Sequence, residues 1–94
     1  MILNFRDNDT AELFAGKRPR AIPPDLATRA VRKLFLIDTV ERLEDLRVPP
    51  GNRLEALSGD RRGQHSIRVN DQWRICFEWF DGNAINVELV DYHR

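Results

Sequence analysis

The strongest constraint on the fold is a series of large apolar residues that recur at odd-numbered positions in the second half of the chain. They are Trp73, Ile75, Phe77, Trp79, Ile85, Val87 and Leu89. A period of two is typical of strands with one face on a core. Directly opposed residues of an antiparallel pair share a face, so both segments can bury these side chains only if opposed numbers sum to an even value.

The turn between these segments follows from that parity. A two-residue turn at Asp81-Gly82 gives an odd sum, whereas a three-residue loop over 81–83 gives an even one and contains residues that tolerate positive φ. We therefore predict three opposed pairs in this hairpin. The pairs are Trp79 with Ile85, Phe77 with Val87, and Ile75 with Leu89.

The preceding hairpin obeys the same parity. A loop over 70–72 sets Val69 against Trp73 and Ile67 against Ile75. Arg68 then lies directly opposite Arg74 on the face away from the core, where two like charges cost stability.

The opposed arginines have two interpretations. The predicted register brings Tyr92 diagonally beside Arg74, and guanidinium groups match phosphate oxygens, which indicates a phosphate site. Alternatively, Glu78 and Glu88 lie on the same face, and the arginines form a solvated lattice of ion pairs.

The first half of the chain has a helical period instead. A short apolar strand is predicted over 1–5, a short helix over 11–15, and a longer helix that starts at Pro23-Pro24 and breaks near Asp38-Thr39 before it resumes. The buried stripe of the longer helix is predicted at Leu26, Ala27, Ala30, Val31, Leu34, Phe35, Ile37, Val40 and Leu43.

Strands are predicted over 53–57, 66–69, 73–80 and 84–90. Helices followed by an antiparallel meander predict an α+β fold, with the helices packed on one face of the sheet.

Composition bounds the class of protein. The 94 residues fit one domain, 1–94. Fifteen basic and 15 acidic residues give zero net charge, which does not indicate a nucleic-acid binder, although local charge can differ. The single cysteine, Cys76, excludes an intrachain disulfide and multi-cysteine metal sites and fits a reducing cytosol. Neither a signal peptide nor a membrane-spanning run is evident, so we expect a cytoplasmic protein without membrane contact.

Four segments together carry a family resemblance. They are the run over 48–55, the loop over 57–63, the hairpin over 66–75 and the terminal Asp91-Tyr92-His93. In this order and at this length they resemble the HigB toxins, also called plasmid maintenance system killer proteins, of the RelE/ParE superfamily. Leu13-Phe14 and the Pro23-Pro24 helix start fit as well, so the resemblance covers nearly the whole chain.

The resemblance implies a RelE-like fold, with helices on one face of a small curved antiparallel sheet. It also implies cleavage of mRNA in the A site of translating ribosomes by an endoribonuclease that needs no metal and no cofactor. A helix-turn-helix antitoxin of the HigA type is implied as the partner that neutralises the toxin, and operator DNA would be contacted only through that antitoxin.

Residue roles also follow from the resemblance. Arg74 matches the arginine that contacts the scissile phosphate, and Asp91, Tyr92 and His93 match the C-terminal active-site residues. In two places the sequence departs from the family pattern. Glu55 stands where some members have a histidine, and Ser58 replaces the usual lysine. His65 or Arg61 could compensate for these changes.

The chemistry of such a site assigns each residue a task. His93 is the best acid or base, because histidine titrates near physiological pH. Arg74, together with Arg68, would stabilise the charge of the phosphorane. Tyr92 would stack on a splayed base, and Asp91 would orient His93 or act as a base itself.

The end of the last strand decides whether these residues converge. Strand alternation points Asp91 and His93 away from Tyr92 unless the strand ends at Val90. We therefore expect the strand to end at Val90.

Basic loops supply further candidates. Contacts to ribosomal RNA are expected from Lys17, Arg18, Arg20, Arg61 and Arg62, and the alternative is that these loops are simply solvated. Two other functional interpretations remain open at this point. The chain could be a non-catalytic or gyrase-directed member of the superfamily that acts by protein binding, or a domain whose arginines are purely structural.

Overall fold

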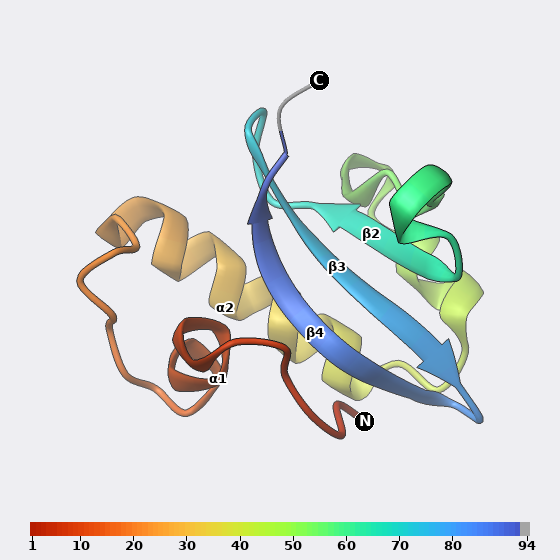
Figure 1. Ribbon diagram of the computed structural model, residues 1–94, viewed down its shortest axis with the longest axis horizontal. Coiled ribbons are helices and arrows are strands. Elements are labelled where there is room, and N and C mark those ends of the chain that lie inside the picture. The colour runs from red at the N-terminus through yellow and green to blue at the C-terminus, as the bar shows by residue number, and fades with distance from the viewer. Residues whose placement is uncertain (93–94) are drawn as a thin grey trace.

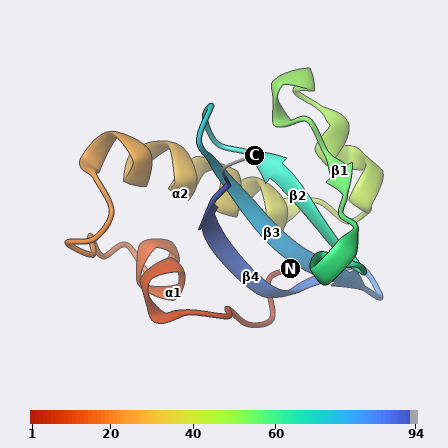
Figure 2. The same cartoon turned by 45° about the horizontal axis from the view of Figure 1, so that its top comes forward.

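The computed structural model describes residues 1–92, in which two α-helices precede a four-stranded antiparallel sheet (Figure 1). The helices are α1 (Asn8–Phe14) and α2 (Pro24–Thr39), followed by the 3-10 helices η1 (Leu43–Arg47), η2 (Pro50–Asn52) and η3 (Gly59–Arg61). The strands are β1 (Glu55–Ala56), β2 (Gln64–Arg68), β3 (Trp73–Phe80) and β4 (Asn83–Asp91), side by side in the order β1-β2-β3-β4 (Figure 2). The predicted α+β organisation is confirmed.

The core lies between α2 and one face of the sheet. From α2 it takes Leu26, Ala27, Ala30, Leu34 and Ile37, and from the sheet chiefly Ile67, Ile75, Phe77 and Val87. The break predicted near Asp38-Thr39 is confirmed, because α2 ends at Thr39 and η1 follows. Phe35 was wrongly predicted to be buried. It is 51% exposed, and its ring contacts Phe14 of α1 at a centroid distance of 5.1 Å.

The predicted strand over 1–5 is reduced to two isolated parallel bridges along the outer edge of β4. Ile2 is bridged to Ala84 and Phe5 to Val87. The segment still pairs through its backbone, since Leu3 N–H donates to the carbonyl of Ala84 at 2.9 Å. It therefore covers an edge of the sheet that would otherwise offer unpaired backbone groups. No helix within residues 1–92 combines the length and the apolar character needed to cross a membrane.

The predicted register of the β2–β3 hairpin is confirmed. Ile67 is opposite Ile75 and Arg68 is opposite Arg74. Val69 N–H donates to the carbonyl of Trp73 at 2.9 Å, which closes the ladder at the loop. The two arginines therefore share the face of the sheet that lies away from α2.

The β3–β4 register is only partly as predicted. Ile75 is opposite Leu89 as expected, but Trp79 is opposite Ala84 and not Ile85. The turn is the two-residue Asp81-Gly82, with φ of 53° and 79°, values that suit the twist of a tight hairpin.

A β-bulge reconciles this turn with a continuous core face. Between the pairs Cys76–Glu88 and Glu78–Ile85, β3 has one residue, Phe77, whereas β4 has two. The additional residue on β4 is Asn86, at φ 53°. This insertion changes the sum of opposed residue numbers from odd, near the turn, to even beyond the bulge. As a result, the even-numbered Ala84 and the odd-numbered Val87 are both buried on the core face.

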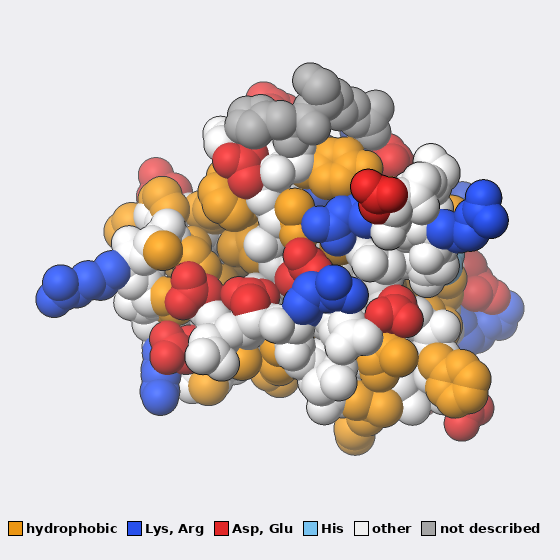
Figure 3. Space-filling view, viewed as in Figure 1, with side chains coloured by type: hydrophobic (Ala, Val, Ile, Leu, Met, Phe, Trp, Pro, Cys, Tyr) orange, Lys and Arg blue, Asp and Glu red, His pale blue; other side chains and the backbone are white. Residues whose placement is uncertain are grey.

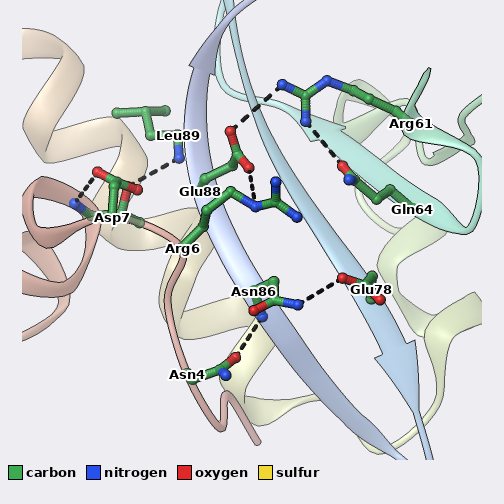
Figure 4. A network of polar contacts seen from close by, with 10 residues as sticks. Asn4, Arg6, Asp7, Arg61, Gln64, Glu78, Asn86, Glu88 and Leu89 are labelled. Carbon is green, nitrogen blue, oxygen red and sulfur yellow. Dashed lines mark hydrogen bonds and ion pairs between the residues drawn. The ribbon is translucent and has the colours of Figure 1, made fainter.

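Two side-chain contacts hold the bulge (Figure 4). The amide nitrogen of the Asn86 side chain donates to Glu78 Oε2 at 2.7 Å, and the backbone N–H of Asn86 donates to Asn4 Oδ1 at 2.6 Å. The bulge therefore also ties the N-terminal segment to β4.

The end of β4 differs from the prediction by one residue. The strand extends to Asp91, which is opposite Trp73, and Tyr92 N–H donates to the carbonyl of Gln72 at 2.7 Å. The expectation that the strand ends at Val90 is therefore wrong, because the loop after β2 offers this additional backbone acceptor. His93 lies outside the described residues.

Replacement of Asn86 should test the bulge. Asn86→Val places a β-branched residue at positive φ and removes the bond to Glu78, so we expect the free energy of unfolding to fall by about 1–3 kcal/mol. Asn86→Gly loses the same bond but tolerates this φ, and should cost less. Urea denaturation measures both variants, and equal losses would contradict a conformational role for this position.

Candidate active site

Arg74 is buried on the sheet face away from α2, with 7% of the residue exposed. Its Nε–H donates to Ser66 Oγ at 2.8 Å on the neighbouring strand β2. Its Nη2 donates to the carbonyl oxygens of Arg53 at 2.6 Å and of Ser66 at 3.4 Å. Three acceptors on two segments therefore fix the plane of the guanidinium group.

A cavity of about 400 Å³ opens beside this guanidinium. It is lined by Arg53, Glu55, Arg68, Asn70, Asp71, Arg74 and Tyr92. The centre of the Tyr92 ring is 5.8 Å from Arg74 Cζ, within the range of a cation–π contact. Three of the predicted site residues, Arg68, Arg74 and Tyr92, are thus brought together around one hollow.

Arg68, the last residue of β2, is positioned by a contact with the loop that follows. Its Nη2 forms an ion pair with the carboxylate of Asp71, which is almost fully exposed. Arg68 is also directly paired with Arg74 across the β2–β3 ladder, and both side chains line the cavity, so two cationic groups face the same space.

Glu55 turns out to belong to the cavity. It pairs with Ser66 in the β1–β2 ladder, which brings its side chain to the face of Arg74. Its Oε1 lies 3.9 Å from Arg74 Nη1, longer than a hydrogen bond, and its side chain is 38% exposed. In the sequence, Glu55 stood out only as a departure from the family pattern. Its position in the cavity depends on the pairing of β1 with β2, which the sequence of β1 does not reveal.

Asp91 is not among the residues that line the cavity. Its carboxylate accepts a hydrogen bond from Gln72 Nε2 at 3.0 Å, next to its pairing with Trp73. Asp91 therefore fastens the end of β4 to the loop between β2 and β3.

Glu88, on the same face, has other arginine partners. Glu88 pairs with Arg6 at 2.8 Å and with Arg61 at 3.5 Å, and Arg61 also donates to Gln64 Oε1 at 3.0 Å (Figure 4). Within the described residues the alternative expectation, that Arg68 and Arg74 form ion pairs with Glu78 and Glu88, is therefore not met: the ion pairs of Glu88 are with Arg6 and Arg61, and Glu78 accepts from Asn86. Acidic and basic side chains are accordingly interspersed on this face (Figure 3).

The remaining candidates lie elsewhere. His65 is opposite Phe77, and its ring stacks on the Phe77 ring at 6.3 Å. Within residues 1–92 its Nδ1 is buried without a hydrogen-bond partner, and burial lowers the pKa of the imidazole. His65 therefore does not take the place of the missing histidine. The basic residues Lys17, Arg18, Arg20 and Arg62 are exposed, and none of them borders the cavity.

Residues 1–92 contain no cluster of three or more histidine, cysteine, aspartate or glutamate side chains that could hold a metal ion.

Removal of the Ser66 hydroxyl should show how strongly the fold depends on the fixed guanidinium. In Ser66→Ala the buried Arg74 Nε–H loses its acceptor, so we expect the free energy of unfolding to fall by about 1–3 kcal/mol. The exposed Ser58→Ala is the matched control. Chemical denaturation compares them, and a decrease no larger than that of the control would contradict the inferred role of Ser66.

Comparison with known proteins identifies the family. Residues 3–93 match the model of a family described as the RelE-like toxin of the type II toxin-antitoxin system HigB. The chain is 43% identical to "Toxin HigB-1" of Vibrio cholerae serotype O1 over 100% of its own length and 99% of that relative. It is 33% identical to "Endoribonuclease HigB" of Proteus vulgaris, with 99% of this chain and all of that relative covered. The chain therefore belongs to the HigB family of type II toxins, whose members are paired with an antitoxin.

Proposed function

We propose that this toxin is an endoribonuclease that cuts mRNA in the ribosomal A site and thereby stops translation and growth, without a metal or a cofactor. The observation that carries the proposal is the cavity in which Arg68, Arg74, Tyr92 and Glu55 converge. The name of the relative from Proteus vulgaris supports the same chemistry.

The proposed reaction is an internal transfer at phosphorus. A base removes the proton of a ribose 2′-hydroxyl, and the 2′-oxygen forms a bond to the adjacent phosphorus. The bond from phosphorus to the 5′-oxygen then breaks, and an acid protonates that leaving oxygen. The products are a 2′,3′-cyclic phosphate and a 5′-hydroxyl end, so atoms and charge balance.

Arg74 supplies the fixed positive charge in this mechanism. Its guanidinium is held by Ser66 and by the Arg53 carbonyl before substrate arrives, so little reorganisation is needed when negative charge develops. Arg68 faces the same cavity and shares the added charge of the phosphorane.

Tyr92 is suited to hold the base next to the scissile bond. An aromatic ring at the edge of a cationic cavity can stack on any base, which positions the ribose without strong sequence preference.

The acid and base are assigned from two kinds of evidence. Glu55 is the carboxylate beside Arg74, so we propose that it accepts the 2′-hydroxyl proton. The family resemblance places His93 among the active-site residues, and we propose that it is the acid that protonates the leaving oxygen. Asp91 lies off the cavity and is bonded to Gln72, which favours a positioning role for it.

The setting of the proposed reaction is the cytoplasm, where mRNA and ribosomes are present. The basic residues Lys17, Arg18, Arg20 and Arg62 would contact ribosomal RNA, since they are exposed. A HigA-like helix-turn-helix antitoxin would neutralise the toxin and would be the component that contacts operator DNA.

The reaction can be tested by induced expression with mapping of mRNA 5′ ends. Wild-type protein should create new ends. Arg74→Lys keeps the charge but loses the planar fork, and should lower cleavage by roughly 10²–10³-fold. His93→Ala should lower cleavage as well, whereas Arg47→Lys on the exposed helix η1 is the matched control and should leave it unchanged.

Growth arrest with no new 5′ ends would contradict the proposal. Gyrase-dependent DNA breaks in those cells would support the alternative, in which the toxin acts by protein binding.

The role of Glu55 calls for a separate variant. Glu55→Gln keeps the shape but removes the base, so the cleavage rate should fall by about 10²–10⁴-fold. RNA affinity should not fall, because a negative charge has been removed beside Arg74. Glu44→Gln, on η1, controls for removal of an exposed carboxylate. A parallel decrease of affinity and rate in Glu55→Gln would indicate a structural role instead.

A further inference from the structure

A second hollow lies on the other side of Arg68. It has a volume of about 440 Å³ and is lined by residues of α2, of η2 and of the end of β2. We call it the α2 groove. Its lining residues are Arg29, Arg32, Lys33, Leu36, Gly51, Arg68 and Val69.

We propose that the α2 groove binds phosphates of the RNA strand that flank the scissile phosphate, through Arg29, Arg32, Lys33 and Arg68. This inference rests on the proposed function and names the path that the substrate takes out of the cavity.

The charge of the groove supports an anionic ligand. Four of its seven lining residues are cationic, and no carboxylate from residues 1–92 is among them. Arg68 is paired with Asp71, which borders the cavity on the other side. Burial, followed by repulsion from Arg29 and Arg68, lowers the pKa of Lys33. Like charges are therefore held close together at a cost that a phosphate group would relieve.

The side chain of Lys33 is held in the groove by a hydrogen bond to a buried residue. Its Nζ donates to Asn52 Oδ1, and Asn52 is fully buried. The Asn52 amide nitrogen donates to the carbonyl oxygens of Leu46 at 3.1 Å and of Val48 at 3.3 Å. The orientation of Lys33 is therefore set by the fold and is not that of a freely solvated surface lysine.

Continuity with the cavity indicates which anion binds. Arg68 lines both hollows because β1 pairs only with His65 and Ser66, which leaves the end of β2 at an open edge. A strand whose scissile phosphate lies at Arg74 must leave the cavity, and its next phosphates would meet the α2 groove through Arg68.

The lining favours RNA over an acidic segment of a protein partner. A docked helix needs apolar anchors. Here the apolar side chains are Leu36 and Val69, and Val69 is only 5% exposed. Guanidinium forks, by contrast, match phosphate oxygens.

The test uses a fluorescent single-stranded RNA made uncleavable by 2′-O-methyl groups, bound to the full chain at several salt concentrations. The double substitution Arg29→Ala with Arg32→Ala should weaken binding roughly 10-fold at low salt. It should also reduce the slope of log K against log salt by about 1.4, at about 0.7 for each phosphate that is no longer neutralised. The matched control, Arg47→Ala on η1, should change neither quantity, and circular dichroism checks that every variant is folded.

Several results would overturn the inference. Unchanged affinity and slope in the double variant would do so, as would failure of the wild-type chain to bind this RNA at low salt. If the double variant no longer binds a polyglutamate peptide but still binds RNA, the groove is a protein-docking surface. The proposed function is judged separately, by whether the wild-type chain creates new mRNA ends.

Discussion

The buried guanidinium of Arg74 is the contact on which the open face of the sheet depends. A charged group that is 7% exposed is tolerated only where it is hydrogen-bonded, and here the acceptors are Ser66 Oγ and backbone carbonyls. One of those carbonyls belongs to Arg53, in the residues between η2 and β1. The same bonds that satisfy Arg74 therefore hold the segment that precedes Glu55, so the guanidinium and the Glu55 carboxylate are positioned by one network.

The parity of the apolar residue numbers predicted the register of much of the sheet, but it failed for the half of the β3–β4 hairpin that lies next to the turn. The rule that apolar residues share a core face correctly paired Ile67 with Ile75 and Ile75 with Leu89. It failed beyond Phe77, because the parity mismatch has two solutions: a three-residue loop, or a two-residue turn with a bulge. The chain uses the second, with Asn86 at positive φ. Asp81-Gly82 and Asn86 both tolerate such angles, but no local pattern distinguishes the two solutions before the strands are paired.

The candidate site was predictable only where it depends on strand alternation. Arg68, Arg74 and Tyr92 share a face for that reason, and they converge as expected. Glu55 could not be placed because β1 has only two residues, too few for a periodic signal. The role of the cations of α2 could not be predicted, since helical periodicity separates buried from exposed positions and carries no information on what an exposed face meets. Their significance depends on Arg68, which comes from a distant part of the chain.

Zero net charge and a nucleic-acid substrate are compatible because the charges of this chain are unevenly distributed. Glu88 neutralises Arg6 and Arg61 on the open face, and Glu44 neutralises Arg42 on the exposed η1 segment. Arg29, Arg32 and Lys33 gather along the α2 groove, whose described lining contains no carboxylate. Field strength near a surface depends on the closest charges, because more distant ones are screened within about 10 Å at ordinary ionic strength. A phosphate at the groove would therefore respond to these cations and to Arg68 far more than to the balance of the whole molecule.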